Sequence, residues 1–229
     1  MSLVQKFLDY LERYRSLTLN EIGNAVVIGV LASIAFVFIF PDESISTLMH
    51  DVFHLPGPGA GIALLVGPAG VLVGLLAYSF NPRPGSILFS VVVFGLLMPM
   101  GQVLFNPDGL GQFPFFFQTL SFIFLAVVLE LLVYKFSKRD EFQRIVAPAV
   151  LANVLFLVFW WLTIFQMYLD RWPLKEKVEV DSFTTGIEYV SPILILVGIS
   201  FVGSVLIGAI VPLIMMSRRV KKSKDTTSF

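Results

Sequence analysis

Residues 66–105 read VGPAGVLVGLLAYSFNPRPGSILFSVVVFGLLMPMGQVLF, two apolar runs separated by the pentapeptide NPRPG. Asn-Pro and Pro-Gly pairs break helices, so this pentapeptide predicts a turn at residues 81–85. The apolar runs extend over 60–80 and 86–105, and each is long enough to cross a hydrocarbon core of about 30 Å. The stretch therefore predicts two membrane-spanning helices joined as a tight hairpin.

The same apolar pattern recurs on both sides of this hairpin, at residues 24–40, 114–135, 145–168 and 191–216. Charged residues make up only 14% of the 229 residues, against roughly a quarter in soluble domains, and they gather between the apolar runs. We therefore predict an all-α fold, a polytopic membrane bundle of about six transmembrane helices. No separate soluble domain fits into the remaining length.

The prediction divides the chain into an amphipathic N-terminal segment (1–23), a six-span membrane domain (24–216) and a basic cytoplasmic tail (217–229). In residues 2–16, apolar side chains recur at helical spacing opposite charged ones, which predicts a helix lying in the membrane interface. A solvated tail is the alternative interpretation of this segment. Thr18 and Glu21 have the spacing of a capping box, which favours a helix start at this point.

Lysine and arginine residues predict the orientation, because segments on the cytoplasmic side carry an excess of both. With the N-terminus inside, the inner segments hold thirteen Lys or Arg residues and the outer loops hold three, Arg171, Lys175 and Lys177. The tail sequence RRVKKSK (218–224) also suits anionic lipid at the cytoplasmic face. We therefore predict a multi-pass protein of the cell membrane with both termini in the cytoplasm.

Sequence motifs of enzymes are missing, among them HExxH, GxSxG and the Walker lysine loop. The chain has no cysteine, which excludes disulfides, thiolate metal sites and a cysteine nucleophile. Its net charge of zero disfavours nucleic-acid binding. The sequence identifies no cofactor, and we predict a binding protein or conduit rather than an enzyme.

Small residues line one stripe of the first predicted span, where Ala25, Gly29 and Ser33 recur at intervals of four. Such a stripe lets another helix backbone approach closely, and we predict that this one contacts a partner protein. Packing within the chain is the alternative. For the glycines of the second and sixth spans, such as the Gly70/Gly74 pair, packing within the chain is the favoured interpretation.

The stretch GPAGVLVGLLAYSF (67–80) resembles the second span of substrate-binding S components of energy-coupling factor (ECF) vitamin transporters. The stripe of Ala25, Gly29 and Ser33 is similar to the small-residue signature on the first helix of that family. The resemblance implies six spans with both ends inside, and a first helix that contacts the membrane coupling subunit of the transporter. It also implies that the first outer loop folds over the substrate site as a lid.

The first outer loop contains the sequence HDVFH, in which His50 and His54 lie four residues apart. On a helix the two imidazoles would share one face, a spacing compatible with Zn, Cu or Ni. We therefore name this pair as a candidate metal site. The alternative is a pair of solvated histidines in an interfacial loop.

Polar and aromatic side chains in the outer halves of spans three to five predict a ligand site, formed by Gln102, Gln118, Trp160, Trp161 and Gln166. Aromatic planes with amide donors and acceptors suit a flat heterocyclic ligand. The alternative is an aromatic belt at the membrane interface. The outer loops hold nine Asp or Glu residues against three Lys or Arg, which favours a cationic or neutral ligand.

Glu130 is a carboxylate inside a predicted span, and Asn153 in the next span falls at a similar predicted depth. A hydrogen bond between these two side chains would satisfy both, and we predict this pairing. The alternative is a functional carboxylate in a coupling or proton-transfer step.

The leading functional hypothesis is a membrane-embedded substrate-capture subunit of an ECF-type importer for a small vitamin-like or metal ligand. Because the chain has no nucleotide-binding motif, ATPase partners would act on it through a membrane coupling subunit. The rival hypothesis is an accessory structural subunit of a multi-subunit membrane enzyme complex. A third is a metal-dependent membrane enzyme built on His50 and His54.

Overall fold

The computed structural model describes residues 17–39, 65–105 and 115–160, together with Glu12, Thr163 and Val202. These residues form five α-helices: α2 (Leu19–Ile39), α5 (Gly67–Phe80), α6 (Ser86–Phe105), α7 (Phe115–Lys135) and α8 (Glu141–Trp160). The helices overlap the first five predicted spans, with different bounds for all but α6. The predicted N-terminal helix except for Glu12, the first outer loop, and the sixth span except for Val202 lie outside the described residues.

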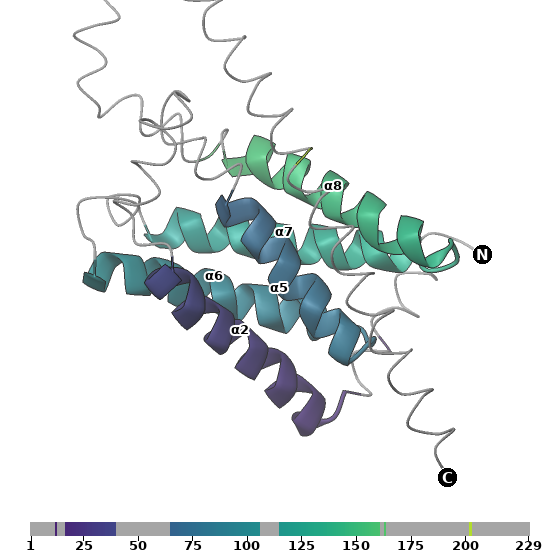
Figure 1. The fold of residues 1–229 in the computed structure, drawn as a ribbon, viewed down its shortest axis with the longest axis horizontal. Helices are drawn as coiled ribbons and strands as arrows, with labels where there is room; N and C mark the ends of the chain where they lie inside the picture. The colour runs from purple at the N-terminus through teal and green to yellow at the C-terminus, as the bar shows by residue number, and fades with distance from the viewer. Residues whose placement is uncertain are drawn as a thin grey trace, which may run out of the picture.

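Four of the five helices, α2, α6, α7 and α8, are long and apolar enough to cross a membrane. These four pack in this order as neighbours in one layer, and α5 lies across one face of that layer (Figure 1). Helix α5 is apolar but has only 14 residues in the described part of the chain. Because α5 contacts all four helices of the layer, it forms the centre of the core.

The predicted turn at residues 81–85 is confirmed, and it joins α5 to α6. The Asn81 amide closes α5 by donating to the Ala77 carbonyl at 3.0 Å, and the Arg83 amide donates to the Asn81 carbonyl at 2.8 Å. Gly85 has a φ of 90°, a conformation that side chains other than glycine rarely adopt. The Phe89 amide then donates to the Gly85 carbonyl, which is the first hydrogen bond of α6.

A row of four buried phenylalanines crosses the layer, with Phe36 on α2, Phe94 on α6, Phe122 on α7 and Phe156 on α8. Ring centroids lie 5.8 Å apart in the first pair and 5.4 Å apart in the other two, and the first two pairs meet edge to face. Such pairs contribute about 0.5–1.5 kcal/mol each beyond the burial of their surface. The row therefore joins all four helices of the layer.

Glycines make room for these rings. A Cβ added at Gly70 of α5 would lie 3.0 Å from the Phe122 ring and 2.7 Å from the Leu125 side chain. A Cβ added at Gly95 of α6 would overlap the Cβ and Cγ of Phe122. The predicted packing of the Gly70/Gly74 pair within the chain is confirmed, because Gly74 likewise meets side chains of α6 and α7.

Large apolar side chains cover the surface of the layer that faces away from α5, including Ile123, Val127 and Leu131 of α7. Their spacing of four places them on one face of that helix, opposite the buried face with Leu125 and Leu129. Exposed apolar stripes on α2 and α8 extend the same kind of surface. A surface of this kind belongs to a membrane-embedded protein, in which lipid chains cover it.

Candidate functional site

The described bundle has two ends that differ in their polar groups. The turn end comprises the start of α2, the 81–85 turn and the last turns of α7. The amide end comprises the last residues of α6 and α8 and the first turns of α7. Because successive helices run antiparallel through the turn at 81–85 and the loop at 136–140, these two groups lie at opposite ends of the layer.

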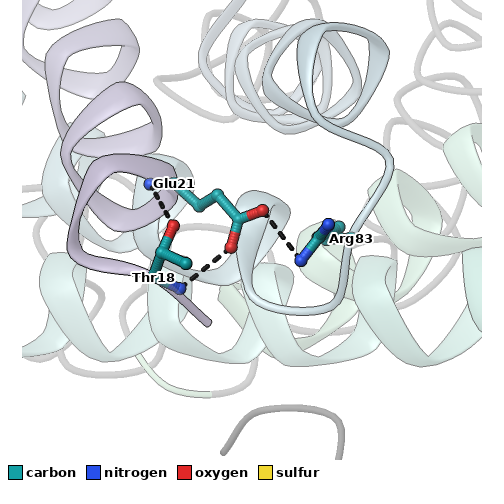
Figure 2. A network of polar contacts seen from close by, with 3 residues as sticks. All are labelled: Thr18, Glu21 and Arg83. Atoms are coloured by element: carbon teal, nitrogen blue, oxygen red, sulfur yellow. Dashed lines mark hydrogen bonds and ion pairs between the residues drawn. The ribbon is translucent and has the colours of Figure 1, made fainter. Parts of the chain in front are cut away.

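At the turn end, the predicted capping box at the start of α2 is confirmed. The Glu21 amide donates to the Thr18 hydroxyl at 3.3 Å, and the Thr18 amide donates to Glu21 Oε2 at 2.9 Å. The second carboxylate oxygen, Oε1, lies 2.9 Å from Arg83 Nη1 (Figure 2). The capping carboxylate thus ties the start of α2 to the turn between α5 and α6.

A second carboxylate, that of Glu130, holds the same turn from the other side. The Gly85 amide donates to Glu130 Oε1 at 2.5 Å, and the Leu88 amide donates to Glu130 Oε2 at 2.8 Å. These amides lie at the start of α6, on Gly85 just before the helix and on Leu88 in its first turn, where backbone N–H groups have no partner within the helix. Gly85 has no side chain that could cap the helix, so Glu130 supplies the cap from α7.

The predicted pairing of Glu130 with Asn153 is therefore wrong. Helix α8 begins at Glu141, so Asn153 lies twelve residues along it, about 18 Å from its start. Its Oδ1 faces Gly67 at the far end of α5, where an added Cβ would overlap it. The depth prediction failed because it placed the start of the fifth span at residue 145, whereas α8 begins at Glu141.

At the amide end, three of the predicted ligand residues come from three neighbouring helices. Gln102 of α6, Gln118 of α7 and Trp160 of α8 retain only 1%, 6% and 2% of their exposure. Burial of two carboxamides in an apolar bundle is costly unless hydrogen bonds accompany it. Such buried groups are therefore candidates for a functional role. Trp161 and Gln166, the other two predicted residues, lie outside the described part of the chain.

Pro99 creates a further polar group, at the middle of α6, that the sequence interpretation missed. Proline has no N–H, so the Gly95 carbonyl four residues earlier receives no hydrogen bond from position 99. The Thr119 hydroxyl of α7 donates to this carbonyl instead, at 3.4 Å. A proline within an apolar span was the available signal, since it always releases one backbone carbonyl.

The small-residue stripe of α2 faces α6 of the same chain. Ala25, Gly29 and Ser33 are buried, and a Cβ added at Gly29 would lie 2.5 Å from the Ser90 carbonyl oxygen. The Ser33 hydroxyl lies 2.7 Å from the Gly29 carbonyl and 3.4 Å from the Phe94 carbonyl of α6. The stripe predicted to contact a partner is therefore covered within the chain in this structure.

The candidate metal residues His50 and His54 lie outside the described residues. Within residues 17–39, 65–105 and 115–160 there is no cluster of three His, Cys, Asp or Glu side chains that could hold a metal ion. The metal site therefore stays a prediction from the sequence.

Comparison of the chain with known protein families, curated proteins and solved structures gives no match. The resemblance to ECF S components thus remains a prediction that rests on the sequence.

Proposed function

We propose that this chain is a substrate-capture subunit in the cell membrane, which takes up a small ligand at the amide end and works with ECF-type partners. The observation that carries the proposal is the burial of Gln102, Gln118 and Trp160, contributed by three adjacent helices, at one end of the bundle. Polar side chains within membrane helices are costly to bury, and many of them line the pathways of substrates or ions.

Ligand capture fits the chemistry of these side chains. Each carboxamide has one acceptor and two donor hydrogens, and the indole of Trp160 adds an aromatic face with one donor. This combination suits a flat heterocycle with polar edges. The free energy for transport would come from ATPases that act through a membrane coupling subunit, since the sequence lacks a nucleotide-binding motif.

The test is a tryptophan-fluorescence titration of the purified full chain in detergent. The probes are lumiflavin, a flat neutral heterocycle, thiamine, a cationic one, and Co²⁺. We expect one probe to bind, and Gln118→Ala and Trp160→Phe to weaken its binding by roughly two- to tenfold, the equivalent of one aromatic or hydrogen-bond contact. Ser121→Ala is the matched control, because the Ser121 hydroxyl donates to the Phe117 carbonyl of its own helix.

The opposite result is also clear. If no probe binds the wild-type protein and the variants leave cellular uptake of all three probes unchanged, the capture proposal fails. The accessory-subunit hypothesis would then replace it, and purification with stoichiometric membrane-enzyme subunits would support that replacement.

The proposed orientation places the turn end in the cytoplasm, with both termini on the same side. The protein has no cysteine, so a single introduced cysteine reports on one position only. We expect Ser137→Cys, in the exposed loop between α7 and α8, to react with a membrane-impermeant maleimide only after cells are permeabilised. Asp108→Cys, in the predicted outer segment after α6, should react in intact cells; the reverse pattern contradicts the proposed orientation.

A further inference from the structure

The neighbouring helices α7 and α8 each carry an exposed apolar stripe that leads to a cation at the turn end (Figure 1). On α7 the stripe with spacing four continues beyond Leu131 to Lys135, which is exposed. On α8 Arg144 precedes the exposed Leu151 by seven residues, which is about two helical turns, so both lie on one face. We call this surface the α7–α8 face and define it by Val127, Leu131, Lys135, Arg144, Leu151 and Leu155.

Two stacked rings show that the two stripes adjoin. Phe124 of α7 and Phe159 of α8 stack with their centroids 4.3 Å apart and their planes 8° from parallel. Both rings are partly exposed, whereas the phenylalanines that cross the core of the same two helices are buried. The stack therefore lies on the outer side of the α7–α8 contact, between the two apolar stripes.

We infer that the α7–α8 face binds one anionic phospholipid, with its phosphate group against Lys135 and Arg144 and an acyl chain along the apolar stripes. The inference goes beyond the proposed capture function and does not depend on it. It specifies a lipid with a net negative headgroup, whereas any bilayer lipid can cover an apolar surface.

The described carboxylates of the turn end are already bound elsewhere. Glu130 accepts from the amides at the start of α6, and Glu21 pairs with Arg83. Asp140 accepts from the Gln143 amide at 2.7 Å and so caps the start of α8. These three groups therefore act as helix caps and do not neutralise the cations of the α7–α8 face.

The cations of this face lack such partners. Lys135 and the two exposed cations of the following loop, Lys138 and Arg139, form no ion pair within the part of the chain that the structure describes. The Arg144 side chain is half-buried, and its Nε has no hydrogen-bond partner among the same described residues. A partly desolvated guanidinium is stabilised by an anion, and phosphate oxygens match its donor geometry. The unmatched positive charge thus favours an anionic headgroup over a neutral one.

The apolar part of the face has the length of one membrane leaflet. Phe124 precedes Lys135 by eleven residues, which corresponds to about 16 Å of helix. A hydrocarbon core of about 30 Å leaves about 15 Å for each leaflet. An acyl chain whose headgroup lies at Lys135 therefore extends over Leu131 and Val127 as far as the stacked rings.

The test is native mass spectrometry of the purified and delipidated full chain, titrated with phosphatidylglycerol or with phosphatidylcholine of the same acyl chains. We expect phosphatidylglycerol to bind about tenfold more tightly, since each lysine or arginine near an anionic lipid contributes roughly fivefold. Glycerol 3-phosphate, which carries the phosphate without the chains, should not displace it at equal concentration. Displacement would indicate a site for a free anion and would overturn the lipid assignment.

Three variants assign the preference to the face. Lys135→Gln and Arg144→Gln should each weaken phosphatidylglycerol roughly fivefold and leave phosphatidylcholine unchanged. Since Lys135 is exposed, its variant leaves the core intact. Leu131→Asn, in the apolar part, should weaken both lipids alike. The matched control is Arg83→Gln, which removes the same charge from the same end but from a cation already paired with Glu21.

Equal binding of the two lipids overturns the inference. A loss for Arg83→Gln as large as that for Lys135→Gln does so as well, because the charge of the whole end would then act without a defined site. Absence of lipid adducts, together with a disulfide between Leu155→Cys and Ser204→Cys of the predicted sixth span, would show that this span covers the face. A disulfide-linked dimer of Leu155→Cys would show a second copy there, and either result overturns the inference. None of these outcomes changes the proposal of ligand capture at the amide end.

Discussion

The turn end and the amide end of the bundle differ in how their buried polar groups are paired. At the turn end, each carboxylate is matched to backbone amides or to a cation, as Glu130 is to the start of α6 and Glu21 is to Arg83. At the amide end, Gln102, Gln118 and Thr119 are uncharged. Hydrogen bonds to a charged group are stronger than those between neutral groups, so the contacts of the turn end are expected to be the more stable of the two.

This difference suggests that the turn end holds the helices in register and the amide end meets the ligand. Substitutions at the turn end should therefore change stability, and substitutions at the amide end should change binding. Substitution of a residue that packs between the two ends should change both stability and binding.

The largest effect is expected for Gly29→Leu, between the two ends. A side chain at this position meets the Ser90 carbonyl oxygen at 2.5 Å, and a backbone atom cannot rotate away. We expect α2 to separate from α6, with a loss above about 3 kcal/mol in the free energy of unfolding and little monodisperse protein in size-exclusion chromatography.

Gly23→Leu is the matched control, because nothing lies within 4 Å of a Cβ at Gly23 on the same helix. If Gly29→Leu folds normally and loses only assembly with other subunits, the stripe is a partner surface after all.

The next effect is expected for Glu130→Ala, which tests the turn end alone. The Gly85 and Leu88 amides lose their charged acceptor in a site where the Glu130 side chain is only 5% exposed. We expect the free energy of unfolding, measured by denaturant titration in mixed micelles, to fall by about 2–4 kcal/mol. Lumiflavin affinity of the remaining folded protein should not change.

Leu131→Ala, on the exposed face of the same helix turn, should cost much less. Equal losses for the two variants would show that the carboxylate does not hold α6, and a functional role for Glu130 would then be favoured.

A smaller effect on stability, but a clear one on binding, is expected for Gln102→Leu at the amide end. The replacement has similar volume and removes a neutral hydrogen-bonding group, so the free energy of unfolding should fall by about 0.5–1.5 kcal/mol, less than for the carboxylate. The affinity for lumiflavin should fall about tenfold with the loss of the carboxamide. A loss of stability as large as that of Glu130→Ala would mean that the two ends do not differ in role.

The smallest effect is expected for Arg83→Gln. The Arg83 side chain is 53% exposed, and solvent-exposed ion pairs contribute about 0–1 kcal/mol. The capping box at Thr18 remains without it. We expect a change below about 0.5 kcal/mol in the free energy of unfolding, and a larger loss would show that the pair with Glu21 is screened from water.

The hairpin could be predicted because its signals are local. The sequence NPRPG cannot continue a helix, and the apolar runs beside it give the observed α6 without a shift at either end. The capping box of α2 is equally local. Hydropathy misplaced the start of α2 by five residues, since the polar residues Asn20 and Glu21 belong to its first turn.

The partners of buried polar groups could not be predicted in the same way, because they depend on how helices rotate against one another. Glu130 was expected to meet a side chain and meets backbone amides instead. The small-residue stripe at Gly29 could pack against any helix. Only the structure shows that it packs against α6. The buried amide residues were identified from their types, but the Gly95 carbonyl carries no side-chain signal at all.

The cap that Glu130 places on α6 has a consequence for biogenesis. A carboxylate on a helix that enters the bilayer alone costs up to about 2.5–3.5 kcal/mol at the membrane centre, and less near the interface. Gly85 and Leu88 precede Glu130 in the chain, so their amides have already left the ribosome when α7 reaches the translocon. Helix α6 is thus synthesised before α7. The Glu130 carboxylate can then enter the lipid already bound to the start of α6, rather than as an isolated charge.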